Sequence, residues 1–148
     1  MLVINTKLVQ AMIAQASKDH PIETCGIIAG KESSNTPSRL IPMRNTARSA
    51  DFFQFDPKQQ LQVWREMDKR GEQPIVIYHS HTDSQAYPSR EDIQLATEPQ
   101  AHYVIIATNS RYSETVRSFR IINGTVTEER IQQVAERQEA LEMSLVGA

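Results

Sequence analysis

The sequence is poor in cysteine and has no strong excess of either charge, and both shortages exclude classes of protein. Cys25 is its single cysteine, so an intramolecular disulfide is excluded and a reducing cytoplasm is the expected location. Sixteen Lys and Arg oppose eighteen Asp and Glu, which leaves a formal net charge of -2. Nucleic-acid-binding domains usually carry a basic excess. We therefore expect no nucleic-acid partner.

Long hydrophobic runs are also missing. The longest, such as residues 75–78 and 103–107, are far shorter than the roughly 20 residues that cross a bilayer. The first residues show a short strand pattern and a polar helix pattern, rather than the basic and then apolar regions of a signal peptide. We expect a cytoplasmic protein without a membrane segment.

The chain is long enough for one domain and too short for two typical ones, with 148 residues. Its composition, 39% hydrophobic and 23% charged, is that of a globular protein. A chain of this size buries roughly 70% of the surface that it exposes when unfolded, so it needs no disulfide or structural metal to fold. We expect a single domain over residues 1–148.

Hydrophobic periodicity predicts strands and helices that are mixed without strict alternation. Strands are expected at residues 2–4, 24–30, 39–43, 52–55, 75–81, 102–108, 115–122 and 125–130. Helices are expected at residues 6–19, 57–70, 89–96 and, as an amphipathic C-terminal helix, at about 131–146. In the second of these helices Leu61, Trp64 and Met67 should face inward. The order predicts one α/β sandwich on a mixed, largely antiparallel sheet.

The segment from Tyr78 to Asp92 carries the chemistry. Side chains two apart on a strand point to the same face, so His79 and His81 can direct both imidazoles at one point. A seven-residue loop then leads to a helix that begins at Ser89, and Asp92 lies in its first turn. Two imidazoles and one carboxylate leave a fourth zinc position open for water, as in catalytic rather than structural zinc sites.

Each part of this pattern also has an ordinary structural interpretation. His79 and His81 alone could be two unrelated histidines of a strand. Ser89 and Asp92, three residues apart, form a common helix N-terminal pattern. Glu23, just before an apolar strand, would by itself be a solvated loop residue.

Three further residues with reactive side chains are not expected to take part. Cys25 lies inside an apolar run, so it is interpreted as a small buried hydrophobic residue. His20 ends a helix and His102 begins a strand, and neither is expected to bind a metal.

Taken together, Glu23 in the segment 21–26 and the spacing His79-x-His81-x7-Ser89-x2-Asp92 resemble the motif of the JAMM, or MPN-plus, metallopeptidases. The segments 25–30 and 44–47 extend the resemblance. It implies a cytidine-deaminase-like α/β sandwich with one zinc ion per chain. It also implies a role for each motif residue: zinc ligands His79, His81 and Asp92, general base Glu23, and oxyanion donor Ser89.

Residues 78–92, 95–99 and 101–104 look most like the bacterial Mec-type branch of this family. Its members hydrolyse the cysteine adduct of a CysO-type sulfur-carrier protein, which has a ubiquitin fold and a C-terminal glycine. Thr82 follows the second histidine where deubiquitinating relatives often have proline, and the chain lacks long insertions for gripping ubiquitin. The resemblance therefore implies release of cysteine from a small carrier, as a step of cysteine biosynthesis.

The carrier's extended tail could pair with a strand edge beside the metal. Tyr87 and Pro88 would then form one wall of the substrate groove. Arg44 and Arg48 could attract the carrier or a carboxylate, or could belong to a solvated loop. The C-terminal helix could pack on its own domain or form the seam of a homodimer.

Several alternatives remain open at this level. The chain could be a JAMM peptidase that trims or deconjugates another ubiquitin-like protein, or an MPN-type interaction scaffold, although such scaffolds typically lose motif residues. Two histidines and one carboxylate also bind iron in oxygenases, which are usually all-β barrels. A cysteine hydrolase based on Cys25 is the last alternative.

Overall fold

The computed structural model describes residues 1–112 and 115–135. Three helices are present in this part of the chain: α1 (Thr6–Asp19), α2 (Pro57–Arg70) and α3 (Arg90–Leu95). The strands are β1 (Leu2–Asn5), β2 (Cys25–Lys31), β3 (Arg39–Met43), β4 (Glu72–His81), β5 (His102–Ala107), β6 (Val116–Ile122), β7 (Thr125–Glu129) and β8 (Ile131–Val134). None of the described helices has the length and apolar character needed to cross a membrane.

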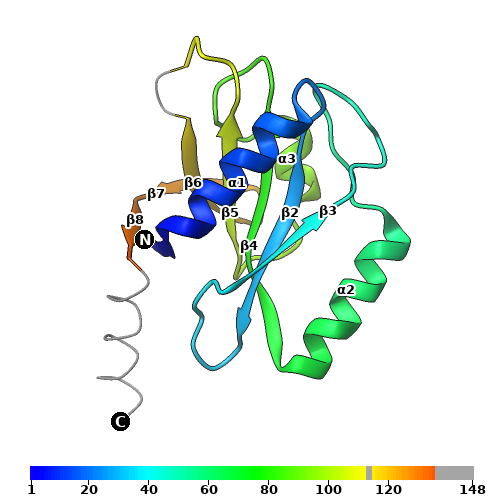
Figure 1. The fold of residues 1–148 in the computed structure, drawn as a ribbon, viewed down its shortest axis with the longest axis vertical. Helices are drawn as coiled ribbons and strands as arrows, with labels where there is room; N and C mark the ends of the chain where they lie inside the picture. Colours follow the sequence, from blue (N-terminus) through cyan, green and yellow to red (C-terminus); the bar gives the residue numbers. More distant parts are fainter. Residues whose placement is uncertain (113–114, 136–148) are drawn as a thin grey trace.

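Six strands form the central sheet in the order β3-β2-β4-β5-β6-β7. Only β4 and β5 run parallel, and every other neighbouring pair in this sheet is antiparallel. The expected mixed, mainly antiparallel sheet is thus confirmed. Figure 1 shows α1 crossing one face of the sheet. In the same view α3 lies behind the sheet, and α2 lies beside β3 and β4.

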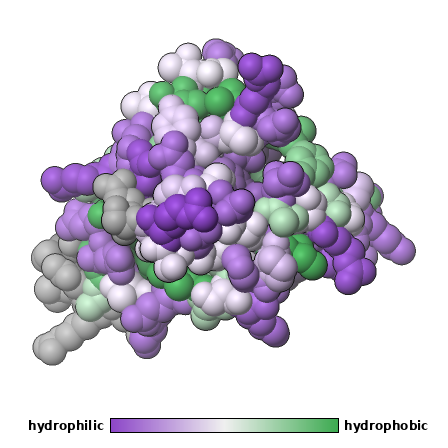
Figure 2. All heavy atoms as spheres, turned by 90° about the horizontal axis from the view of Figure 1, so that it is seen from above, coloured by the Kyte–Doolittle hydropathy of each residue, from purple (hydrophilic) through white to green (hydrophobic). Residues whose placement is uncertain are grey.

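Alternate residues of the central strands divide the core between the two faces of the sheet. Ile28 and Tyr78 belong to a cluster with Met12 of α1, whereas Ile27 packs with Met67 of α2. The period of two places His79 and His81 on the face opposite Tyr78. In the view from above in Figure 2, the surface is mainly hydrophilic and its hydrophobic patches are small and separate.

Local sequence signals explain where α2 begins and ends. Asp56 Oδ1 accepts a hydrogen bond from Lys58 N, and Pro57 occupies the first helical position. Gly71 ends the helix with φ 66°, in the left-handed region that glycine adopts without strain. The predicted bounds are confirmed, and Met67 is buried with Trp64 packed on the same cluster, as predicted. Leu61 was wrongly placed inside: it is 52% exposed, and Val63 is buried instead.

The strand predicted at residues 52–55 is not formed. Only an isolated bridge joins Asn45 to Phe55. The Asn45 side chain takes the place of a ladder partner, because its Nδ2 donates to Phe52 O and its Oδ1 accepts from Gln54 N. A side chain that bonds to nearby backbone competes with strand pairing in this way.

The helix predicted at about 131–146 is wrong for its first residues. Ile131–Val134 form β8, which pairs in parallel with β1, Leu2 opposite Ile131. The backbone groups of β1 lie outside the central sheet, and β8 provides their hydrogen-bond partners. The rest of the predicted helix, residues 136–146, lies outside the described residues.

Candidate metal centre

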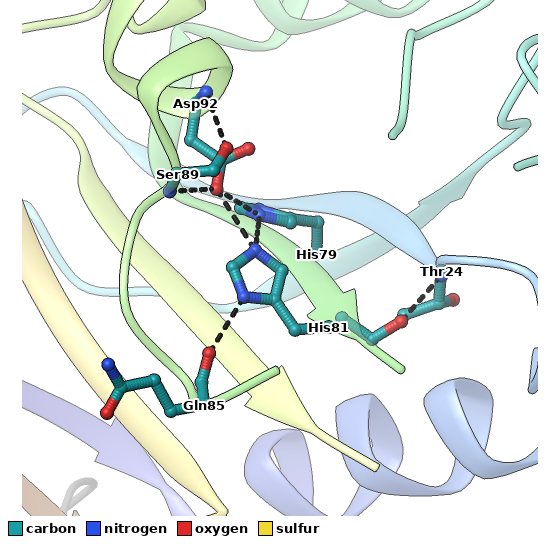
Figure 3. A network of polar contacts seen from close by, with 7 residues as sticks. Thr24, His79, His81, Gln85, Ser89 and Asp92 are labelled. Carbon is teal, nitrogen blue, oxygen red and sulfur yellow. Dashed lines mark hydrogen bonds and ion pairs between the residues drawn. The ribbon is translucent and has the colours of Figure 1, made fainter. Parts of the chain in front are cut away.

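The C-terminal end of β4 and the first turn of α3 bring three potential ligands together. His79 Nε2 and His81 Nε2 lie 3.1 Å apart, and Asp92 Oδ2 lies 3.1 Å from the first and 3.0 Å from the second (Figure 3). Ligands about 2.0–2.1 Å from a tetrahedral zinc ion are roughly 3.3 Å from each other. The three atoms therefore fit three corners of a zinc coordination shell, and they form the one such group among the described residues.

Each histidine is held by a different neighbour. His81 Nδ1 lies 2.8 Å from Gln85 O, and because a carbonyl can only accept, Nδ1 must carry the proton. The Nε2 lone pair of His81 is then free for a metal. The ring of His79 stacks on Phe53, with 4.5 Å between the ring centroids and 24° between the planes.

Asp92 is oriented by the helix cap. Ser89 N donates to Asp92 Oδ2 at 2.8 Å, and Asp92 N donates to Ser89 Oγ at 3.1 Å, which confirms the predicted capping box. Burial would raise the pKa of Asp92, but its contacts with His79 and His81 and the hydrogen bond from Ser89 N outweigh this effect and hold the pKa far below its usual range. Asp92 is therefore ionised, as a metal ligand must be.

Glu23 is buried just before β2, with 3% of its surface exposed. Burial raises the pKa of its carboxyl to about 8; His81 opposes this rise, and Asp92 adds to it. The carboxyl thus lies within electrostatic reach of two of the three potential ligands. A carboxyl with a shifted pKa that interacts with a ligand group is a candidate for proton transfer.

An apolar cavity of about 240 Å³ opens beside the ligands. His79, Asp92 and Pro88 line part of it. Tyr87 is outside the lining; its ring is 43% exposed and meets Phe119 edge-on at 5.3 Å. The remaining apolar lining comes from the 53–55 segment, the helices α2 and α3, and the sheet: Phe53, Phe55, Trp64, Leu95, Ile105 and Ile121.

The other reactive side chains do not belong to the ligand group, as the sequence predicts, although Cys25 lies opposite His79 in the pairing of β2 with β4. Cys25 is fully buried, and burial raises the pKa of its thiol to about 12, which disfavours a nucleophilic thiolate. His20 Nδ1 is 2.8 Å from Thr108 Oγ1, and His102 Nδ1 is 2.6 Å from a carboxylate oxygen of Glu129.

The structure also reveals supporting residues that the sequence did not assign. Phe53 and Gln85 contact the two histidines. The side chain of Asn45 donates a hydrogen bond to Glu23 O, and the side chain of Thr82 donates one to Ala50 O. The 45–54 segment carries no periodic signal. Asn45 entered the sequence analysis only as part of the segment 44–47, which extends the resemblance to the JAMM family.

The sheet and the His-His-Asp group together define an α/β protein of the JAB/MPN type. The chain belongs to the prokaryotic homologs of the JAB domain, because residues 5–122 match the sequence profile of that family. It is 52% identical over 134 residues to the CysO-cysteine peptidase of Mycobacterium tuberculosis (strain H37Rv), an alignment that covers 90% of this chain and 92% of that protein.

Three further comparisons fit this assignment. The desampylase of Haloferax volcanii is 29% identical over 97 residues, which cover 65% of this chain and 70% of that protein. The solution structure of a protein from Desulfitobacterium hafniense superposes with a TM-score of 0.75 at 31% identity, covering 93% of this chain and 97% of that one. A JAB1/MPN domain protein from Archaeoglobus fulgidus shares the fold, with a TM-score of 0.58 at 18% identity, covering 90% of this chain and 100% of that one.

Proposed function

We propose that this chain is a zinc metallopeptidase that hydrolyses the amide bond between the C-terminal glycine of a ubiquitin-like sulfur-carrier protein and cysteine. The observation that carries the proposal is the convergence of His79, His81 and Asp92 in a chain that is 52% identical, over 90% of its length, to a CysO-cysteine peptidase. The products would be free cysteine and the regenerated carrier.

His79, His81 and Asp92 would hold one zinc ion per chain. Bound zinc supplies two kinds of chemistry, since it lowers the pKa of water toward roughly 7 and polarises a carbonyl as a Lewis acid. The protein's contribution is to bring the three ligand atoms together and to favour an ionised Asp92. Burial lowers the pKa of His79, which favours the neutral, ligating imidazole.

Glu23 would move the proton. Its carboxyl is buried and electrostatically coupled to the ligand group, so it can accept a proton and return it to the nitrogen of the leaving cysteine. The buried position keeps bulk water from competing for that proton.

Ser89 would stabilise the oxyanion without giving up its helix cap. A hydroxyl has one donor and two acceptor positions. The cap uses Ser89 Oγ only as an acceptor from Asp92 N, so the O–H group stays available to donate to a developing negative charge. Capping and catalysis thus use different parts of one side chain.

The apolar cavity beside His79 would receive the carrier tail. Pro88 lines the cavity and would contribute to its wall. Tyr87 would instead contact the carrier from outside the cavity, where its ring is partly exposed. Arg44 and Arg48 lie in an exposed loop, and Arg44 is 3.9 Å from Asp56, so the solvated-loop interpretation suits them better.

A cytoplasmic location and a homodimer formed through the C-terminal segment stay predictions. The segment that would form the dimer lies mainly outside the described residues. Sedimentation of the full chain, with and without residues 136–148, would measure whether that segment joins two copies.

A second candidate function is the release of a ubiquitin-like protein from a modified protein. It is favoured by the 29% identity to a desampylase. The catalytic residues would be the same, and only the leaving group would differ.

The two functions are separated by kinetics on two substrates that share one carrier. One substrate carries cysteine on the C-terminal glycine, and the other carries the side-chain amine of a lysine peptide. We expect kcat/KM to be at least tenfold higher for the cysteine adduct. A preference for the lysine conjugate would favour the second function, and cleavage of neither substrate by zinc-loaded protein would refute both.

A further inference from the structure

The side chain of Asn45 uses its whole hydrogen-bonding capacity on backbone atoms. Nδ2 donates to Glu23 O at 3.1 Å and to Phe52 O at 3.0 Å. Oδ1 accepts from Ala47 N at 3.0 Å and from Gln54 N at 3.1 Å. An asparagine amide has two donor and two acceptor positions, and all four are occupied here.

Two of these partners, Phe52 and Gln54, are the chain neighbours of Phe53. The ring of Phe53 stacks on that of His79, with 4.5 Å between the ring centroids. Within the described residues no hydrogen bond reaches His79 Nδ1, while its Nε2 faces His81 and Asp92. A metal-binding histidine is normally oriented by a hydrogen bond at its second nitrogen. At His79 the stacked Phe53 ring takes over this orienting role.

The same loop, residues 45–54, also forms hydrogen bonds with the backbone of Glu23. Its carbonyl accepts from Asn45 Nδ2, and its N–H donates to Ser49 O at 2.9 Å. Thr82, directly after His81, donates through Oγ1 to Ala50 O at 2.6 Å. Residues 45–54 therefore connect the backbone of Glu23, the end of β4 and the ring of His79.

We propose that Asn45 is a positioning residue that sets the Glu23 carboxyl and the His79 imidazole at a fixed distance from each other. It touches neither the substrate nor the metal, and acts through the backbone of Glu23 and through Phe53. The proposal rests on the proposed function for the roles of Glu23 and His79. Its effect on metal binding does not depend on which substrate is cleaved.

Asn45→Asp is the sharpest test, because the two side chains have nearly the same shape. The substitution places a carboxylate oxygen where the Nδ2 donor was, opposite the carbonyl oxygens of Glu23 and Phe52. Misplacement of reacting groups by about 1 Å can cost roughly 10²-fold in rate. Loss of an outer contact to a metal ligand typically weakens metal binding about 10- to 100-fold.

Thr46→Val is the matched control. Thr46 Oγ1 donates to Gln54 O at 3.0 Å from the neighbouring, exposed position, so this variant removes one hydrogen bond to the same segment. The backbone bond from Thr46 N to Gln54 O remains. Metal binding and kcat should be unchanged in Thr46→Val.

The experiment uses the full chain and three measurements: zinc affinity by competition with a chromophoric chelator, the visible spectrum of the cobalt-loaded protein, and kcat and KM on the carrier-cysteine adduct. For Asn45→Asp we expect weaker zinc binding, an altered cobalt spectrum and a kcat reduced about 10- to 100-fold, with KM within about threefold of wild type. A wild-type cobalt spectrum together with a wild-type kcat would overturn the proposal.

Phe53→Leu decides the matter if Asn45→Asp does not fold. It keeps every hydrogen bond of Asn45 and an apolar cavity wall but removes the stacked ring. An altered cobalt spectrum and weaker zinc binding support the proposal, and wild-type values for both overturn it. If wild-type protein cleaves no adduct while the cobalt spectra of the variants still change, the proposed function fails and the role of Asn45 in metal positioning stands.

Discussion

The surroundings of the two carboxylates of the site shift their pKa values in opposite directions. Burial raises the pKa of Glu23 to about 8, whereas the contacts of Asp92 with His79 and His81 outweigh burial and keep its pKa far below the usual range. Paired acids whose environments separate their pKa values usually have different catalytic roles. This separation supports Asp92 as ligand and Glu23 as proton carrier.

Removal of the Glu23 carboxyl should separate metal binding from turnover. Glu23→Ala should retain zinc and lose about 10²- to 10⁴-fold in kcat, because a positioned base commonly contributes that much. Turnover and metal content of the purified variant measure the two effects. Glu91→Ala, at an exposed position next to Asp92, is the control and should keep wild-type turnover. Equal turnover in Glu23→Ala would remove Glu23 from the mechanism.

Ser89 should combine a structural and a catalytic contribution. Ser89→Ala removes the N-cap of α3, which costs about 1 kcal/mol of unfolding free energy, and the oxyanion donor, which costs about 10²- to 10³-fold in kcat. Asp56→Ala removes the N-cap of α2 and serves as the comparison. Denaturant melts should show similar losses of stability in the two variants, with kcat falling only in Ser89→Ala. A normal kcat in Ser89→Ala would leave Ser89 as a cap alone.

At the scale of elements, one half-buried carboxylate, away from the metal centre, connects three strands. Glu129 at the end of β7 accepts from His102 Nδ1 of β5 and from Ser118 Oγ of β6. Burial raises the pKa of Glu129, but these hydrogen bonds outweigh it and lower the pKa from 4.5 to about 2. The folded state therefore favours the ionised carboxyl more than the unfolded state does.

Acid should weaken this connection in a defined pH range. Because the folded pKa lies below the unfolded value, the stabilisation is complete above about pH 5 and is lost as the pH falls toward 2. Glu129→Gln should lower the unfolding free energy near pH 7 by about 1–2 kcal/mol, a discounted figure because the carboxyl is partly solvated. The variant should also lose less unfolding free energy than wild type as the pH falls from 5 to 2, which denaturant melts between pH 2 and 7 would measure. An equal loss in both proteins would show that other groups control acid unfolding.

The success of sequence-based prediction differed between elements for physical reasons. β2 and β4 were predictable because a run of buried apolar residues has no alternative to the sheet interior. The 52–55 segment was not, because the side chain of Asn45 replaces the expected ladder. Cap residues fixed the bounds of α2, and periodicity placed Trp64 and Met67 correctly on the core, but Leu61 was wrongly placed inside.

In the candidate site, too, some residues could be predicted from the sequence and others could not. His79, His81 and Asp92 lie close together in sequence. Strand and cap geometry allow them to converge, and the resemblance to the JAMM motif is what predicts that they do. The supporting contacts join distant segments through single atoms, such as Thr82 Oγ1 to Ala50 O, and no sequence pattern encodes them. That bond also gives Thr82 a role that proline, without a hydroxyl, cannot provide.

At the scale of the whole molecule, apolar packing accounts for the core of the described fold. Three clusters of buried apolar residues lie on the two faces of the sheet. The fold should therefore survive without zinc, unlike small domains that require a structural metal.

Metal removal should abolish turnover and leave a folded protein. Chelator-treated protein should keep its circular dichroism spectrum and its cooperative melting, with a lower Tm because zinc stabilises only the folded state that binds it. Restored turnover on adding zinc back controls for irreversible damage. Unfolding of the chelated protein at 25 °C would mean that the metal is structural.

The central claim is that the His-His-Asp centre releases cysteine from a carrier protein, and the intact mass of the carrier tests it most directly. The full chain is incubated with a carrier-cysteine adduct and excess zinc, and a parallel sample contains chelator. The account predicts that the carrier loses the mass of one cysteine residue in the zinc sample and keeps it in the chelated sample. An adduct of unchanged mass in the zinc sample, or equal loss in both samples, would contradict it.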